Sequence, residues 1–316
     1  MAHARLDFAA RNTPLEPADR LAVELGLARG ALWVKRDDLT GLAGGGNKAR
    51  KLEYLCADAQ QRGCDVLVTG GAAQSNHVRM TAAAGARLGL AVVAVLAGDE
   101  RPDRAAEGNL ALDRLFGAEL RWAGAGDLDA ALAGVGAELE AAGRRPSLIP
   151  LGGSSPIGAL GYVECADEID AELPDALVVC ADGSGGTHAG LVAGFGDHGR
   201  VLGVNVGFAA LGDRLARLAE QTAAAARRRA PVGEVQLDPG QPEPYGAPTE
   251  ATREALWLAA RSEGLALDPV YTGRAMAALC RRARAGSLGV ERPVVFLHSG
   301  GLPGLLVQRY ADWFAS

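Results

Sequence analysis

Residues 64–98 read CDVLVTGGAAQSNHVRMTAAAGARLGLAVVAVLAG. The run Cys64–Gly71 is apolar and ends in two glycines, which is typical of a buried strand. Ser75–Gly89 then shows a helical pattern opened by a capping serine or asparagine, and Leu90–Gly98 is a second apolar run. A strand, a helix and a strand in this order predict a βα unit of a parallel sheet.

The same alternation of apolar runs and helical patterns continues along the chain. It predicts further strands over Pro146–Gly153, Asp175–Ala181, Arg200–Gly207 and Pro293–His298, and helices over Ala105–Gly117, Asp127–Gly143, Ile157–Leu173, Thr187–Gly196 and Leu211–Arg229. The proline-rich residues 231–248 are predicted to form a loop. We therefore expect an α/β fold with open, mainly parallel sheets. Two α/β lobes without a visible linker indicate interleaved domains.

The composition of the 316-residue chain excludes several classes of protein. Apolar residues make up 48% and charged residues 22%, which rules out a disordered or fibrous chain. A net charge of −6 and 5% aromatic residues argue against a nucleic-acid partner. No apolar stretch reaches the roughly 20 residues that a bilayer requires, so no membrane partner is expected. The N-terminus lacks an apolar signal region and the five cysteines include no C-x-x-C, which predicts a cytoplasmic protein.

A glycine-rich segment, Gly183–Thr187, lies between a predicted strand and a predicted helix. In that setting backbone N–H groups and the helix dipole bind phosphate, and the hydroxyls of Ser184 and Thr187 add donors. The alternative is a plain turn in which the glycines serve only close packing. A dinucleotide fingerprint would need glycine in place of His188, and a nucleophile elbow would need it in place of Asp182, so neither motif is present.

Lysine chemistry has few candidates, because only Lys35, Lys48 and Lys51 are lysines. Lys48 follows the glycine run 44–46 and opens an amphipathic helix. Desolvation or neighbouring charge can turn such a lysine into a neutral amine that forms Schiff bases, whereas a solvated first-turn lysine is the alternative. Asn47 stands where a P-loop has its lysine, which disfavours an ATP site.

Polar residues of three further segments are candidates for binding and acid–base chemistry. Ser75 and Asn76 begin a predicted helix, where they serve as caps or form an anion site for a small carboxylate. Tyr245 and Tyr271 lie outside the core pattern and are candidate acids or ring-stacking groups. The five histidines lack metal-ligand spacing, so no metal is expected.

Together these motifs resemble those of a known family. They occur in the order Lys35–Asp38, Gly45–Glu53, Gln74–His77, Gly183–Gly190, Tyr245–Glu250, Asp268–Gly273 and His298–Gly301. From about Asn12 to the last strand, the chain is similar to the D-cysteine desulfhydrase and 1-aminocyclopropane-1-carboxylate deaminase family of fold-type II pyridoxal-phosphate enzymes. The resemblance implies a homodimer with the tryptophan synthase β-like fold. Residues 49–164 would form a smaller α/β domain inserted into a larger cofactor-binding domain of residues 1–48 and 165–316.

The resemblance also implies roles for the site residues. Lys48 would form the Schiff base with pyridoxal 5′-phosphate, and Asn76 would bind the hydroxyl of its ring. Ser75, Tyr245 and Tyr271 would be active-site residues beside a small amino-acid substrate. The phosphate would be held by the loop residues Gly183, Ser184, Gly185, Gly186 and Thr187.

Two positions distinguish the activities within the family. The deaminases have glutamate and leucine where this chain has Thr272 and Ser299, whereas the desulfhydrases carry small hydroxyl residues at both positions. A carboxylate near the pyridine nitrogen keeps the ring protonated and a strong electron sink, which opening a cyclopropane requires. Hydroxyl partners leave a weaker sink, which suffices when a good β-leaving group departs.

We therefore expect α,β-elimination of D-cysteine to pyruvate, hydrogen sulfide and ammonia. Lys48 is the expected base for the Cα proton, and Tyr271 or Tyr245 the expected proton donor to the leaving thiolate. D rather than L stereochemistry comes from the resemblance alone. The alternatives are an L-cysteate sulfo-lyase, a lyase for another β-substituted amino acid, a 1-aminocyclopropane-1-carboxylate deaminase, and a nucleotide- or ligand-binding protein without catalysis.

Overall fold

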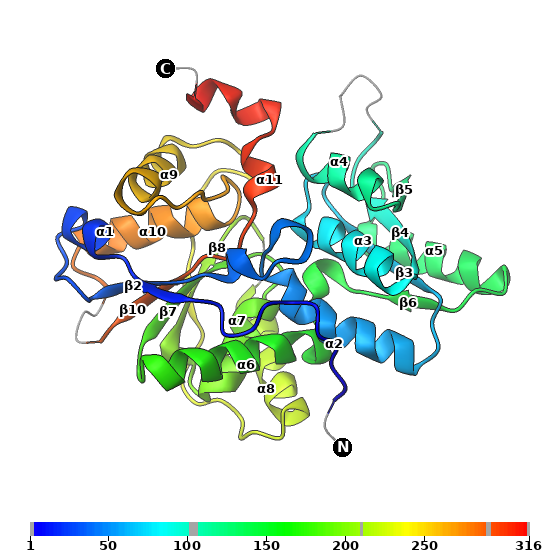
Figure 1. Cartoon of the computed structure of the whole chain (residues 1–316), viewed down its shortest axis with the longest axis horizontal. Helices are drawn as coiled ribbons and strands as arrows, with labels where there is room; N and C mark the ends of the chain where they lie inside the picture. Colours follow the sequence, from blue (N-terminus) through cyan, green and yellow to red (C-terminus); the bar gives the residue numbers. More distant parts are fainter. Residues whose placement is uncertain (1–2, 101–106, 209–210, 289–291, 315–316) are drawn as a thin grey trace.

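A computed structural model describes residues 3–100, 107–208, 211–288 and 292–314, which form two sheets flanked by helices (Figure 1). The strands are β1 (Leu15–Pro17), β2 (Leu32–Lys35), β3 (Val66–Gly71), β4 (Ala91–Leu96), β5 (Glu119–Trp122), β6 (Pro146–Leu148), β7 (Leu177–Asp182), β8 (Val201–Asn205), β9 (Gln236–Asp238) and β10 (Val294–Leu297). The helices are α1 (Asp19–Glu24), α2 (Lys48–Gln61), α3 (Asn76–Leu88), α4 (Gly108–Leu115), α5 (Leu128–Ala141), α6 (Pro156–Glu172), α7 (Gly186–Phe195), α8 (Leu211–Ala225), α9 (Glu250–Glu263), α10 (Thr272–Arg284) and α11 (Leu302–Leu305).

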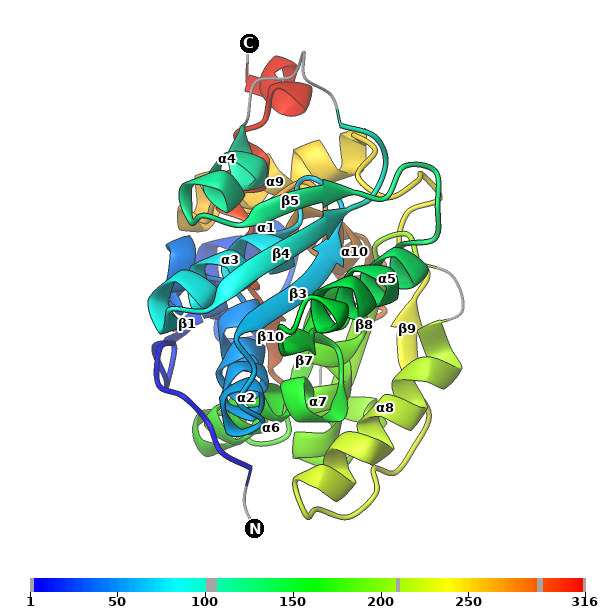
Figure 2. The same ribbon diagram turned by 90° about the vertical axis from the view of Figure 1, so that its right-hand side faces the viewer.

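The larger sheet has the strand order β1-β2-β10-β7-β8-β9 and the smaller one the order β5-β4-β3-β6. All neighbouring strands pair in parallel except β1 and β2. The chain leaves the larger sheet after β2, builds the smaller sheet with β3 to β6, and returns with β7; Figure 2 faces the smaller sheet. The predicted α/β class with two open, mainly parallel sheets is confirmed. The domain boundaries at residues 48/49 and 164/165 stay a prediction.

Both faces of the larger sheet are buried by helices. Leu177 and Val179 of β7 pack into a core with α1, α9 and α10, whereas Val178 and Cys180 pack into a second core with α6, α7 and α8. Figure 1 shows the two groups of helices on opposite sides of this sheet. Successive side chains of a strand point to opposite faces, so a strand buried on both faces is apolar throughout. This explains why the runs of the sequence are continuous rather than alternating.

The segment 64–98 forms β3, α3 and β4 as predicted. The hydroxyl oxygen of Ser75 caps α3 by accepting a hydrogen bond from the N–H of Val78, and the helix ends at Gly89 in the left-handed conformation. Leu67 of β3 packs on α2 and α3, and Val66 and Val68 pack on α5. Capping at both ends, together with burial of both faces, therefore decides the local structure here.

Several elements were not predicted from the sequence. Residues 231–248 contain the strand β9, so the prediction of a loop throughout was wrong. β9 spans only three residues, which is too short for a hydrophobic period to be detected. The sequence also left β1, β2, β5, α1, α9, α10 and α11 unassigned. The predicted helix Ala105–Gly117 corresponds to α4, and its residues 105–106 lie outside the described residues.

The described helices include none that is long and apolar enough to cross a membrane.

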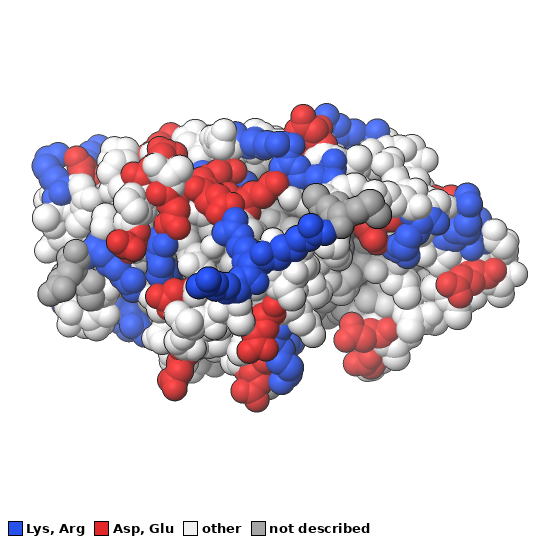
Figure 3. All heavy atoms as spheres, turned by 90° about the horizontal axis from the view of Figure 1, so that it is seen from below, with Lys and Arg blue, Asp and Glu red and all other residues white. Residues whose placement is uncertain are grey.

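On the face of the molecule seen from below, acidic and basic side chains lie next to each other (Figure 3). The five cysteines are free thiols, and four of them are buried.

Candidate active site

One cavity of about 330 Å³ lies at the carboxyl ends of strands from both sheets. Segments that follow β3, β7 and β10 line it, as expected for ligand sites of parallel sheets. Its wall includes the predicted site residues Lys48, Ser75, Asn76, Gly183, Ser184, Gly185, Thr187, Tyr245, Tyr271 and Ser299. Gly186 and Thr272 do not line the cavity.

Lys48 is the first residue of α2 and reaches the cavity wall. The glycine run before it makes a tight turn, in which Gly45 has φ +80° and a Cβ would collide with the carbonyl oxygen of Asp38. Burial lowers the pKa of Lys48 to about 8, although the carboxylates of Asp182 and Asp268 favour its charged form. Near pH 8 comparable fractions of this amine are therefore charged and neutral.

Lys51 is a second lysine at the cavity, and the sequence reasoning did not assign it to the site. Its side chain is fully buried, and its Nζ donates to the carbonyl of Gly152 at 3.2 Å and to Oγ of Ser154 at 3.4 Å. Burial, and then the charge of Lys48, hold the pKa of Lys51 well below its usual range. The spacing of three residues, which puts both lysines on one helix face, was the available signal.

The loop between β7 and α7 presents donors to the cavity. Gly185 is the N-cap of α7 and has φ +84°, a conformation that favours glycine. The hydroxyls of Ser184 and Ser154 lie 2.7 Å apart, and the N–H of Gly186 donates to Ser154. Thr187 accepts a hydrogen bond from the side chain of Asn47 at 3.0 Å. Hydroxyls and a helix N-terminus therefore converge at one end of the cavity.

Two tyrosines close the cavity from the α10 side. The hydroxyl oxygens of Tyr245 and Tyr271 are 2.6 Å apart, and the ring of Phe208 stands edge-on to that of Tyr245. Burial raises the pKa of Tyr245 to about 12 and that of Tyr271 well above its ordinary value. Both phenols therefore keep their protons at neutral pH and can act as acids. No local signal in the sequence pointed to Phe208.

Arg274 of α10 holds the segment that carries Tyr245. Its fully buried guanidinium donates, among the residues that the structure describes, to the backbone carbonyls of Val206, Glu243, Pro244 and Ala247. This arrangement satisfies carbonyls of a loop that has no regular secondary structure at Tyr245.

Thr272 is fully buried next to Asp268. Its hydroxyl donates to Oδ1 of Asp268 at 2.7 Å and accepts from the N–H of Asp268 at 2.7 Å. The N–H of Thr272 donates to the same carboxylate oxygen. The Thr272 hydrogen is therefore engaged within the turn that opens α10, and a role toward the cofactor ring stays a prediction. Ser299 lies at the cavity wall.

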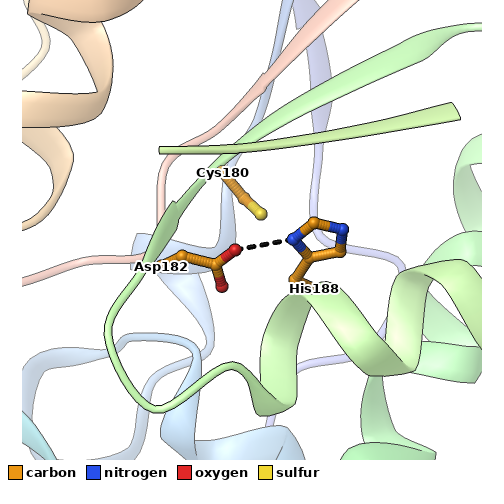
Figure 4. A group of neighbouring side chains, drawn as sticks. All are labelled: Cys180, Asp182 and His188. Atoms are coloured by element: carbon orange, nitrogen blue, oxygen red, sulfur yellow. Dashed lines mark hydrogen bonds and ion pairs between the residues drawn. The ribbon is translucent and has the colours of Figure 1, made fainter. Parts of the chain in front are cut away.

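Cys180, Asp182 and His188 form a buried group where β7 leads into α7 (Figure 4). Nδ1 of His188 and Oδ2 of Asp182 are 2.6 Å apart. A tetrahedral zinc ion binds each nitrogen or oxygen ligand at roughly 2.0–2.1 Å, so two ligand atoms of one ion lie more than about 3 Å apart. The short separation is thus that of a hydrogen bond, which joins the end of β7 to α7 across the loop.

A family model described as "Pyridoxal-phosphate dependent enzyme" matches residues 6–300. The chain belongs to this family. D-cysteine desulfhydrases of Yersinia pestis and Yersinia enterocolitica are each 42% identical to it, over 96% of both chains. A crystal structure titled as an ACC deaminase homologue superposes with a TM-score of 0.88 at 36% identity, covering 98% of this chain and 94% of that one. Threonine deaminase isoform 2 from Solanum lycopersicum, at 19% identity and a TM-score of 0.66, shares the fold; the match covers 93% and 80%.

The residues of the cavity fit pyridoxal phosphate, the cofactor of this family. The cavity combines an amine with a lowered pKa, a helix N-terminus with hydroxyl donors, and a second buried lysine beside that terminus. The first feature suits reaction with an aldehyde, and the other two suit binding of a phosphate dianion.

The reaction of the apo-protein with pyridoxal phosphate is expected to accelerate as pH rises through about 8. Below that pH Lys48 is mostly protonated and cannot attack a carbonyl; above it the neutral amine predominates. Stopped-flow absorbance between pH 6.5 and 9.5 measures the rate. A rate that is flat across this range, or that falls with pH, would contradict the lowered pKa.

Proposed function

We propose that this chain is a D-cysteine desulfhydrase, which converts D-cysteine and water to pyruvate, hydrogen sulfide and ammonia. The observation that carries the proposal is that Lys48, the 183–187 loop and the tyrosine pair share one cavity. Near-full-length identity of 42% to the Yersinia D-cysteine desulfhydrases supports the choice of substrate.

The cofactor would be held at three points by residues of the cavity. Lys48 would bind it covalently, the 183–187 loop together with Lys51 would bind its phosphate, and Asn76 would bind its ring oxygen. A phosphate beside Lys51 would restore the charged form of that amine, since an opposite charge raises the pKa of a lysine. When bound, pyridoxal phosphate supplies an electron sink for the negative charge that develops at Cα.

The substrate carboxylate would lie at the start of α3. The hydroxyl of Ser75 accepts from Val78 at 3.3 Å, so its hydrogen is available to an anion, and the dipole of α3 adds to the attraction. The amine of Lys48, once displaced, would take the proton from Cα, because its pKa of about 8 suits a base near neutral pH.

The tyrosine pair would assist the leaving group. When the Cβ–S bond breaks, the sulfur carries the electron pair away and needs a proton. Tyr271 and Tyr245 keep their protons because burial raises the pKa of each, and the 2.6 Å contact lets one phenol reprotonate the other. Ser299, which lines the cavity, would offer the cofactor ring a hydroxyl in place of a carboxylate and leave it a weaker electron sink, which suffices for the loss of sulfide. Thr272 would act only indirectly, since its hydroxyl is bonded to Asp268.

The purified enzyme is expected to release sulfide and pyruvate in equal amounts from D-cysteine. L-Cysteine and 1-aminocyclopropane-1-carboxylate should react at least roughly 100-fold more slowly in kcat/KM. The Cα proton of L-cysteine would point away from the base, and the cyclopropane has no leaving group at Cβ. A pyruvate assay coupled to lactate dehydrogenase, with parallel sulfide detection, measures the first two substrates. 2-Oxobutyrate detection measures the third.

The same panel tests the alternatives. Preferential release of sulfite from L-cysteate, or of pyruvate from D-serine or β-chloro-D-alanine, would replace D-cysteine by another β-substituted amino acid. Efficient opening of the cyclopropane would contradict the argument from Thr272 and Ser299. A purified protein that binds no pyridoxal phosphate would contradict catalysis altogether.

We also propose that the enzyme is a cytoplasmic homodimer. The free thiols support a reducing compartment, because buried unpaired cysteines are compatible with the cytosol. Sedimentation equilibrium should give about twice the chain mass of 32.4 kDa. A monomeric mass would remove the dimer from the proposal.

A further inference from the structure

Arg79 is a fully buried arginine on α3, one helical turn after Asn76. Its Nη1 contacts the side-chain amides of Asn76 at 3.1 Å and of Asn109 at 2.9 Å, and its Nη2 donates to the carbonyl of Gly45 at 2.9 Å. A guanidinium has five donors and no acceptor. The atom that each amide turns toward Arg79 must therefore be its oxygen.

Asn109, near the start of α4, restrains the same amide a second time. Because its oxygen faces Arg79, its NH2 group points the other way and donates to Oδ1 of Asn76 at 3.0 Å and to the carbonyl of Gln74 at 2.8 Å. Both of these atoms are acceptors, so the assignment is consistent throughout the network. The side chain of Asn109 is fully buried and has no alternative solvent partner.

Asn76 also lines the cavity. Two buried donors occupy Oδ1, while within the described residues no acceptor is bonded to its NH2 group. We infer that Arg79 and Asn109 are positioning residues that fix the Asn76 amide with its NH2 group toward the cavity, where it donates to an oxygen of bound pyridoxal phosphate. This inference rests on the proposed function, in which Asn76 meets the oxygen of the cofactor ring.

The alternative orientation of the amide is strongly disfavoured. Turning the amide over would place its NH2 group against donors of Arg79 and Asn109 and would leave one buried N–H of each unpaired. Burial lowers the pKa of Arg79 to about 10, which still leaves it charged at neutral pH, and the nearby carboxylate of Asp113 favours that charge. A fixed cation behind Asn76 favours an anionic oxygen over a neutral hydroxyl on the cavity side.

The test compares three variants of the cofactor-loaded enzyme. Asn109→Asp keeps an oxygen for Arg79 but replaces the donor to Asn76 by an acceptor, which repels Oδ1 of Asn76 and favours the turned-over amide against the remaining bond from Arg79. Asn76→Asp keeps both buried hydrogen bonds but presents oxygen instead of NH2 to the cavity. Both variants should weaken cofactor binding about tenfold or more and shift the visible absorption maximum in the same direction.

Gln74→Ala is the matched control. It removes the bond from the N–H of Asn109 to Oε1 of Gln74 and the bond from Nε2 of Gln74 to the carbonyl of Glu107. These bonds join the segment before α3 to the start of α4, and the side-chain amide of Asn109 stays in place. This variant should melt at a lower temperature, with the dissociation constant and absorption maximum of the wild type. A purely structural role of Asn109 predicts instead that Gln74→Ala and Asn109→Asp behave alike.

The outcomes separate the inference from the proposed function. If Asn76→Asp changes affinity and absorption but Asn109→Asp does not, Asn76 keeps its proposed role and the positioning inference is wrong. If Asn76→Asp changes neither the affinity nor the absorption, the proposed role of Asn76 and the positioning inference are both wrong. Should Asn109→Asp fail to fold, Asn109→Ala decides: binding weakened about threefold supports the inference, because only Arg79 then restrains the amide, and wild-type affinity overturns it.

Discussion

Replacing Lys48 with alanine is expected to abolish the visible absorption band of the bound cofactor and to lower kcat for D-cysteine by at least roughly 1000-fold. The variant would lose both the covalent attachment and the base for the Cα proton, because we propose that the same amine serves both roles. Absorbance spectra and steady-state kinetics of the purified protein measure the two losses.

Lys51→Met is the control for this substitution. Lys51 is fully buried and donates to Gly152 and Ser154, so methionine preserves its volume while removing its amine. The band should persist at saturating cofactor, with weaker binding because the phosphate loses a cation. A peptide map after borohydride reduction should show the adduct on Lys48, and an adduct on Lys51 would show the assignment to be wrong.

Replacing Ser184 and Thr187 together with alanine is expected to weaken cofactor binding about 100-fold, with near-normal turnover at saturating cofactor. Each hydroxyl bond to a charged group contributes about 1.5–3 kcal/mol. We expect the lower end, because Ser184 already contacts Ser154 and Thr187 already accepts from Asn47. Fluorescence titration of the apo-protein measures the dissociation constant.

A buried hydroxyl far from the loop provides the control for the double variant. Ser262 of α9 donates to the carbonyl of Leu258 at 2.7 Å and does not line the cavity. Ser262→Ala should leave cofactor affinity unchanged. Unchanged affinity in the Ser184 and Thr187 double variant as well would favour the plain turn, in which the glycines of the loop serve only packing.

The sequence by itself determined the features that depend on neighbours along the chain. The βα units from β3 onward follow from apolar runs, caps and glycines that act within a few residues, and Ser75 caps α3 as predicted. The loop 183–187 and Lys48 were predicted as site candidates for the same reason, since a strand, a glycine loop and a helix start are local patterns. The resemblance to pyridoxal-phosphate enzymes rests on these segments together with five further short motifs between Lys35 and Gly301.

Only the tertiary structure decided the features that depend on contacts between distant segments. The lowered pKa of Lys48 arises because folding desolvates the amine beside Asp182 and Asp268, more than 130 residues further along the chain. Arg79 and Asn109 meet at Asn76 only because α4 packs on α3. No local pattern distinguishes a buried arginine or asparagine from an exposed one, since the burial of a residue depends on how the whole chain packs and not on the neighbours of that residue in the sequence.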